Sequence, residues 1–133
     1  MFNVIFSEGG EYPFAYVYKN VELLLKNYNS LDGIVNNAGL TGTSPILNYV
    51  VKPNLQSYES FLLAMRINLA APFLLMQLLT PLLLKGKNTS VVNISSINGH
   101  LTSKPNLYKD LNMESPAAYE ISKAGLVQLR SEE

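Results

Sequence analysis

One nearly uninterrupted apolar run, residues 67–84, constrains this 133-residue chain more than any other feature of its sequence. As a helix the run would be about 27 Å long, close to the lower limit for crossing a bilayer. Five residues interrupt it, three polar and two prolines: Asn68, Gln77, Thr80, Pro72 and Pro81. The pattern therefore favours a helix buried in a core or at a subunit interface, interrupted at its prolines, over a membrane anchor.

The composition describes an ordered globular domain without strong charge. Lysine plus arginine number 10 and aspartate plus glutamate number 10, and charged residues make up only 15% of the chain. This balance excludes a basic nucleic-acid-binding surface. Hydrophobic residues make up 47%, and the length fits a single domain over residues 1–133.

Two residue types that often form catalytic or metal sites, cysteine and histidine, are absent or scarce in this sequence. The chain has no cysteine and a single histidine, His100, so neither thiol catalysis nor a histidine-based metal site is expected. The short apolar start, residues 1–6, lacks the length and basic flank of a signal peptide. Together these features predict a cytoplasmic protein without a bound metal.

Alternating helix and strand patterns predict a parallel α/β fold. Residues 2–6 and 14–18 are predicted as short strands, and apolar side chains at helical spacing predict a helix from Asn20 to about residue 30. Ser57 is predicted to cap the following segment, which forms a long helix or two stacked helical pieces. Further predicted elements are buried strands at 31–35 and 90–94, helices at 57–84 and 116–130, and loops at 40–56 and 98–115. Buried strands that alternate with helices are typical of a parallel sheet.

Candidate functional residues follow the two predicted strands. Residues 36–39 and the pair Ser95 and Ser96 come directly after them, at the edge where ligands bind in open parallel sheets. The last helix carries Tyr119 and Lys123, four residues apart and therefore on one face. An ammonium beside a phenol favours the phenolate form, which can exchange a proton with an alcohol or carbonyl. The Ser96 hydroxyl can hydrogen-bond the same substrate oxygen.

Four motifs, in order, resemble those of the short-chain dehydrogenase/reductase family. They are LDGIVNNAG at 31–39, Asn68 within MRINL, VVNISS at 91–96, and the Tyr119-x-x-x-Lys123 pair. The resemblance covers residues 19–130, and residues 1–18 form an atypical N-terminal segment. It implies a partial Rossmann-like fold: a three-layer, doubly wound parallel sheet without the family's N-terminal Gly-rich βαβ part and its C-terminal strands.

The resemblance also implies a role for each catalytic candidate. Tyr119 would be the acid/base, Lys123 would bind the nicotinamide ribose and promote the phenolate, and Ser96 would polarise the substrate oxygen. Asn68 would hold a water in a proton relay. The implied reaction moves a hydride between NAD or NADP and a small-molecule alcohol or carbonyl.

The remaining implied roles concern the cofactor and the assembly. Asn36, Ala38 and Gly39 would line the adenosine side of the cofactor or brace the sheet beneath it. The helices at residues 57–85 and 117–130 would pair subunits in a homodimer or homotetramer.

Two alternatives stay open beside this hypothesis. The first is a non-catalytic remnant of the family that acts as a dimerisation or interaction module. The second, less favoured, is a membrane-associated protein anchored through residues 67–84.

Overall fold

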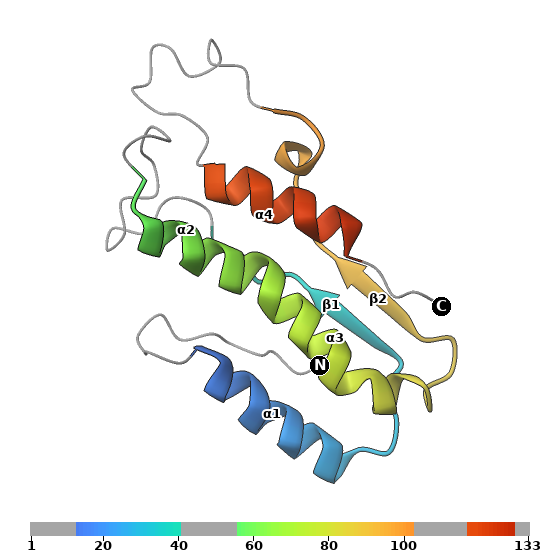
Figure 1. Ribbon diagram of the computed structural model, residues 1–133. Helices are drawn as coiled ribbons and strands as arrows, with labels where there is room; N and C mark the ends of the chain where they lie inside the picture. Colours follow the sequence, from blue (N-terminus) through green and yellow to red (C-terminus); the bar gives the residue numbers. More distant parts are fainter. Residues whose placement is uncertain (1–12, 41–55, 103–116, 130–133) are drawn as a thin grey trace.

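Residues 13–40, 56–102 and 117–129 are described by the computed structural model. Their elements, in order, are α1 (Pro13–Asn27), β1 (Gly33–Asn36), α2 (Tyr58–Met65), η2 (Arg66–Ala70), α3 (Ala71–Leu83), β2 (Ser90–Asn93), η3 (Ile97–Gly99) and α4 (Ala117–Gln128). The strands β1 and β2 pair in parallel, with Gly33 opposite Ser90 and Asn36 opposite Asn93. The predicted parallel sheet is confirmed, and α1, α3 and α4 lie on one side of it (Figure 1).

The apolar run belongs to one continuous helix built from α2, η2 and α3. Ser57 caps its start as predicted: the backbone is extended there, and Oγ accepts the Ser60 amide at 3.1 Å. Of the two predicted forms, the structure shows the long helix, and the prolines do not break it into two stacked pieces. Ala71 N–H bonds to the Arg66 carbonyl, five residues back, and this wider π turn accommodates the Pro72 ring. Pro81 lies near the end of α3, three residues before the C-cap Leu84.

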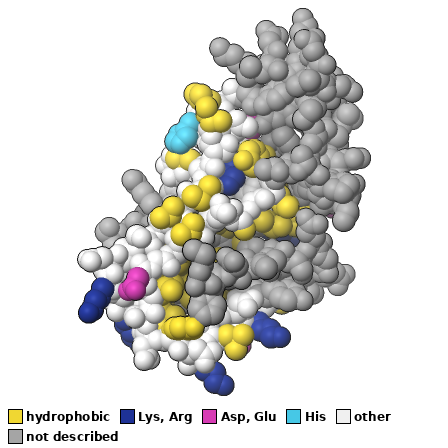
Figure 2. All heavy atoms as spheres, turned by 180° about the vertical axis from the view of Figure 1, so that it is seen from behind, with side chains coloured by type: hydrophobic (Ala, Val, Ile, Leu, Met, Phe, Trp, Pro, Cys, Tyr) yellow, Lys and Arg dark blue, Asp and Glu magenta, His cyan; other side chains and the backbone are white. Residues whose placement is uncertain are grey.

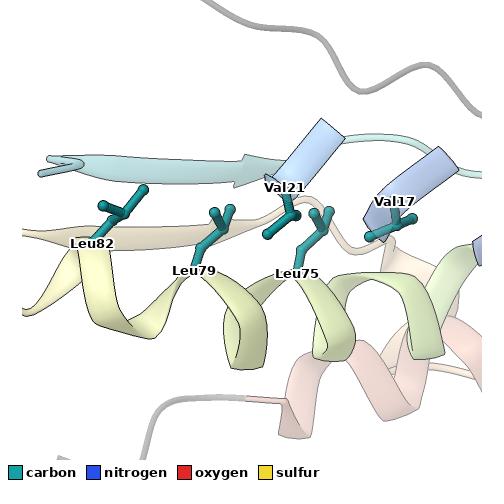
Figure 3. Packing of buried hydrophobic residues seen from close by; sticks show 5 residues of the cluster. All are labelled: Val17, Val21, Leu75, Leu79 and Leu82. Atoms are coloured by element: carbon teal, nitrogen blue, oxygen red, sulfur yellow. The ribbon is translucent and has the colours of Figure 1, made fainter. Parts of the chain in front are cut away.

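The main core lies between α1 and α3. Figure 3 shows its aliphatic side chains pointing toward one another from the two helices: Val17, Val21, Leu75, Leu79 and Leu82. Ile34 of β1 packs against the same cluster. By length and composition alone the helix Tyr58–Leu83 could cross a membrane. Its Leu75, Leu79 and Leu82 are at most 8% exposed because they pack on α1, as expected of the favoured core helix.

The strand predicted at residues 14–18 is wrong, because these residues form the first turns of α1. Pro13 begins the helix, where its fixed φ is favourable. Val17 and Val21 then fall on the face that packs against α3, and this packing overrides the β-propensity of the aromatic and branched residues. The strand predicted at 2–6 and most of the loops predicted at 40–56 and 98–115 lie outside the described residues.

The prediction that both strands are buried is wrong for one face of the sheet. Side chains alternate along a strand, so Ile34 faces the helices while Val35 points away from them. Val35 is 64% exposed and its partner Val92 is 44% exposed. Figure 2 shows hydrophobic side chains on the side of the molecule behind the view of Figure 1. The described residues therefore supply a sheet and one helical layer of the expected three layers.

Candidate active site

Several of the predicted site residues lie together where β2 ends and α4 crosses it. Ser95 Oγ donates to the Lys123 carbonyl oxygen at 2.8 Å, and Lys123 Nζ donates to the Ile94 carbonyl at 2.7 Å. Lys123 is thus tied to the end of β2 by both its backbone and its side chain. The sequence places Ser95 beside the candidate Ser96 but does not reveal this tether.

Lys123 and Tyr119 come together as their helical spacing predicts. Nζ of Lys123 lies 5.9 Å from the centroid of the Tyr119 ring. Tyr119 is half-buried, whereas Lys123 is only 4% exposed, and this desolvation lowers the pKa of its ammonium from the usual 10.5. An ammonium has three N–H donors, and the Ile94 bond uses one. The side chain is therefore suited to take a further oxygen acceptor.

Asn68 lies inside η2, fully buried, with its amide engaged by the protein. Oδ1 accepts the Leu40 N–H at 2.7 Å, while Nδ2 donates to the Leu40 carbonyl at 3.2 Å and to Ser122 Oγ at 2.9 Å. Both side-chain donors are used, so only a lone pair on Oδ1 is left for the water that the resemblance implies. Leu40 and Ser122 are partners that the sequence did not indicate.

Ser96 is placed at the turn that follows β2. Its backbone is extended, and its Oγ accepts the Asn98 N–H at 3.2 Å as the cap of η3. A hydroxyl that accepts in this way keeps its own O–H for another oxygen. The turn lies tightly on α4: a Cβ on Gly99 would be 2.8 Å from the Lys123 carbonyl oxygen.

Asn36 faces the helices and not the exposed end of the site. It is 6% exposed and donates from Nδ2 to Asn93 Oδ1 at 2.8 Å, while Asn93 Nδ2 donates to the Leu129 carbonyl at 2.7 Å. These bonds join β1, β2 and the end of α4. The resemblance implies that Asn36 either lines the cofactor or braces the sheet. These hydrogen bonds brace the sheet.

Ala38 and Gly39 are exposed, and Gly39 borders Lys123. A Cβ on Gly39 would lie 3.4 Å from Lys123 Nζ and 3.5 Å from Asn68 Oδ1. The glycine therefore leaves space directly beside the ammonium. His100 is exposed, and within the described ranges no three acidic or histidine side chains gather as a metal site would require.

Comparison with known proteins identifies the family. A family model described as short chain dehydrogenase matches residues 14–132. The uncharacterized oxidoreductase YxjF of Bacillus subtilis is 32% identical over 85 residues, which is 64% of this chain and 30% of that protein. The chain therefore spans about a third of the length of this curated relative.

Solved structures of similar fold include two NADP complexes. A short chain dehydrogenase from Shigella flexneri 2a, complexed with NADP, is 31% identical with a TM-score of 0.64, covering 84% of this chain and 40% of that one. A Pseudomonas aeruginosa RhlG/NADP active-site complex is 25% identical with a TM-score of 0.68, covering 86% and 40%. The expected Rossmann-like α/β fold is confirmed, and the chain belongs to the short-chain dehydrogenase/reductase family, whose members are oxidoreductases.

Proposed function

We propose that this chain carries the acid–base part of an NADP(H)-dependent oxidoreductase site. The reaction would transfer a hydride between the cofactor and a small-molecule alcohol or carbonyl. The observation that carries the proposal is the Tyr119–Lys123 pair, held over the end of β2 by the Ile94 and Ser95 contacts. The preference for NADP(H) over NAD(H) rests on the relatives whose structures contain NADP.

The residues beside Lys123 fit the sugar end of such a cofactor. Two ammonium donors of Lys123 are left for hydroxyl oxygens after its bond to Ile94. Gly39 has no side chain to fill the adjoining space, and the neighbouring backbone is exposed. Ala38 and Gly39 would therefore lie against the cofactor, while Asn36 would hold the strands beneath it through Asn93.

In the reducing direction a bound cofactor would supply the hydride, and the residues of this chain would supply the proton. Tyr119 would donate a proton to the carbonyl oxygen as negative charge develops on it. The Ser96 hydroxyl would donate a hydrogen bond to the same oxygen, and the nearby Lys123 charge would stabilise the phenolate left behind. Asn68 would accept one hydrogen of a relay water at Oδ1, its remaining site.

The assembly of subunits is part of the same proposal. The helices within residues 57–85 and 117–130 carry large apolar side chains that stay exposed: Tyr58 at 70%, Phe73 at 52% and Ile121 at 49%. Exposed apolar surface of this kind marks protein interfaces. A homodimer or homotetramer through these helices would cover it, and light scattering on Phe73→Lys would then report a smaller assembly.

The test is titration calorimetry with NADPH and NADH. We expect saturable NADPH binding, and Lys123→Ala should raise its dissociation constant about 10- to 100-fold. This factor corresponds to the free energy of hydrogen bonds from a charged donor. Tyr119→Phe should keep binding and lose carbonyl reduction. Lys85→Ala, at an exposed lysine after α3, is the matched control and should bind like the wild type.

Two results would contradict the proposal. If a folded wild-type chain binds neither nucleotide, the interaction-module alternative is favoured. If Lys85→Ala weakens binding as much as Lys123→Ala does, the loss of affinity comes from removing any positive charge. The assignment of Lys123 to the cofactor site would then be wrong.

A further inference from the structure

Ser122 lies between Tyr119 and Lys123 on α4, and the proposed reaction gives it no role. Its side chain is fully buried. Its Oγ accepts a hydrogen bond from Asn68 Nδ2 at 2.9 Å and donates to the Tyr119 carbonyl oxygen at 2.9 Å. One small hydroxyl therefore joins the π segment η2 to the backbone of the proposed acid/base residue.

The bond from Ser122 Oγ to the Tyr119 carbonyl lies in the turn of α4 that carries the two proposed site residues. In an α-helix the carbonyl of residue 119 is also the acceptor for the amide of residue 123. Ser122 Oγ thus bonds to the carbonyl of the turn that carries both Tyr119 and Lys123. Any rotation of that turn moves both side chains together.

Asn68 extends the connection beyond η2. Through its two bonds to Leu40 it is fixed to the segment that follows β1. The series Leu40, Asn68, Ser122, Tyr119 therefore links the end of β1, the middle of the long helix and the first half of α4. A second tether, Ser95 to the Lys123 carbonyl, holds the same turn from the β2 side.

We propose that Ser122 is a positioning residue, whose two hydrogen bonds set the pose of α4 so that Tyr119 and Lys123 meet the ends of the strands. Without the hydroxyl, one donor of the buried Asn68 amide has no acceptor, and the turn is held from one side only. The consequence for cofactor binding rests on the proposed function. The expected change in the position of Lys123 follows from the hydrogen bonds alone and does not depend on the proposed function.

The experiment compares Ser122→Ala, Ser122→Thr and Asn68→Ala with a buried control. Ser60→Ala is that control: Ser60 is a 1% exposed serine on α2 that accepts a bond from Ser57 Oγ at 3.0 Å, outside the site. The first readout is the NMR signal of the Lys123 side chain in the cofactor-free protein, which reports its bond to Ile94. The second is the NADPH dissociation constant from calorimetry.

We expect Ser122→Ala to shift the Lys123 signal and to weaken NADPH binding about tenfold, as the loss of one hydrogen bond implies. Asn68→Ala should shift the signal in the same way, and the double variant should add nothing further. Ser122→Thr, which keeps the hydroxyl, should restore the wild-type signal. Ser60→Ala should lower stability without moving either readout.

An unchanged Lys123 signal in Ser122→Ala overturns the inference, as does an equal shift in Ser60→Ala. Additive shifts of Ser122→Ala and Asn68→Ala also count against it, because they would mean that the two residues act separately. Should the wild-type chain fail to bind NADPH, the proposed function falls while the NMR readout still decides the role of Ser122.

Discussion

Gly99 is the position where one added methyl group should disturb the site most directly. It ends η3, and a Cβ there would lie 2.8 Å from the Lys123 carbonyl oxygen and 2.9 Å from Ser95 Oγ. Both are held by their mutual hydrogen bond, so neither can turn aside as a flexible side chain would. Gly99 has no positive φ, and Gly99→Ala therefore acts through space alone.

The cost follows from the displacement that an alanine requires. Ordinary contact begins at 3.4 Å, so η3 and α4 must separate by about 0.6 Å. Overpacking of this kind costs about 1–3 kcal/mol of the free energy of unfolding. For a chain of this length that corresponds to a fall in melting temperature of about 4–12 °C.

The measurement is thermal and urea unfolding followed by circular dichroism. Gly39→Ala is the matched control, since its Cβ would meet Lys123 Nζ at 3.4 Å, an ordinary contact, and the variant should unfold within about 0.5 kcal/mol of the wild type. If Gly99→Ala melts with the wild type, the close approach of η3 to α4 is not a feature of the molecule in solution, and the reasoning fails.

Three further predictions concern stability. Leu79→Ala should lose about 2–5 kcal/mol in urea unfolding because it opens a cavity between α1 and α3, whereas Leu84→Ala, at a 66% exposed position, should lose less than about 0.5 kcal/mol. A Leu79→Ala loss no larger than that of Leu84→Ala would contradict the core assignment. Burial lowers the pKa of Lys123 below 10.5 in the folded chain. Between this lowered pKa and 10.5, the unfolded chain binds more protons than the folded chain does. The free energy of unfolding should therefore rise with pH over that range. Lys123→Met should lack that rise in urea unfolding at stepped pH, and an equal slope in both proteins would refute it. Asn93→Ala should cost about 1–3 kcal/mol in urea unfolding because it leaves the buried Asn36 amide without its acceptor, while Asn27→Ala, at an exposed amide, should be near neutral. Equal stability of these two variants would show that the Asn36–Asn93 bond contributes nothing.

The parts of the site that follow from local geometry could be predicted from the sequence. Tyr119 and Lys123 share a face because they are four residues apart on a helix. Ser96 lies at the strand ends because parallel strands present their carboxyl ends at one edge. Ser57 caps its helix because an extended serine there can accept an amide of the first turn. Each of these needs only a few neighbouring residues.

The parts that depend on distant residues could not be predicted. The strand expected at 14–18 is helix because α3 offers Val17 and Val21 an aliphatic surface, which propensity alone does not register. Asn68 and Ser122 are 54 residues apart in sequence, and no local pattern pairs them. Ser95 and Ser96 are adjacent, yet it is Ser95 that bonds to the Lys123 carbonyl. The sequence alone does not show which of the two hydroxyls makes this bond.

Two groups of buried residues have different physical roles. Between α1 and α3 the core is aliphatic, and its packing stabilises the fold without strict dependence on direction. Where α4 meets η2 and the strand ends, four buried polar side chains lie among the apolar ones: Asn36, Asn68, Ser122 and Lys123. Hydrogen bonds are directional, so they fix one pose of α4 where packing would tolerate several. Acid–base chemistry needs such a fixed pose, because displacements of about 1 Å can cost about 100-fold in rate. Substitutions between α1 and α3 should therefore change stability alone, while those at the strand ends should also move Tyr119 and Lys123.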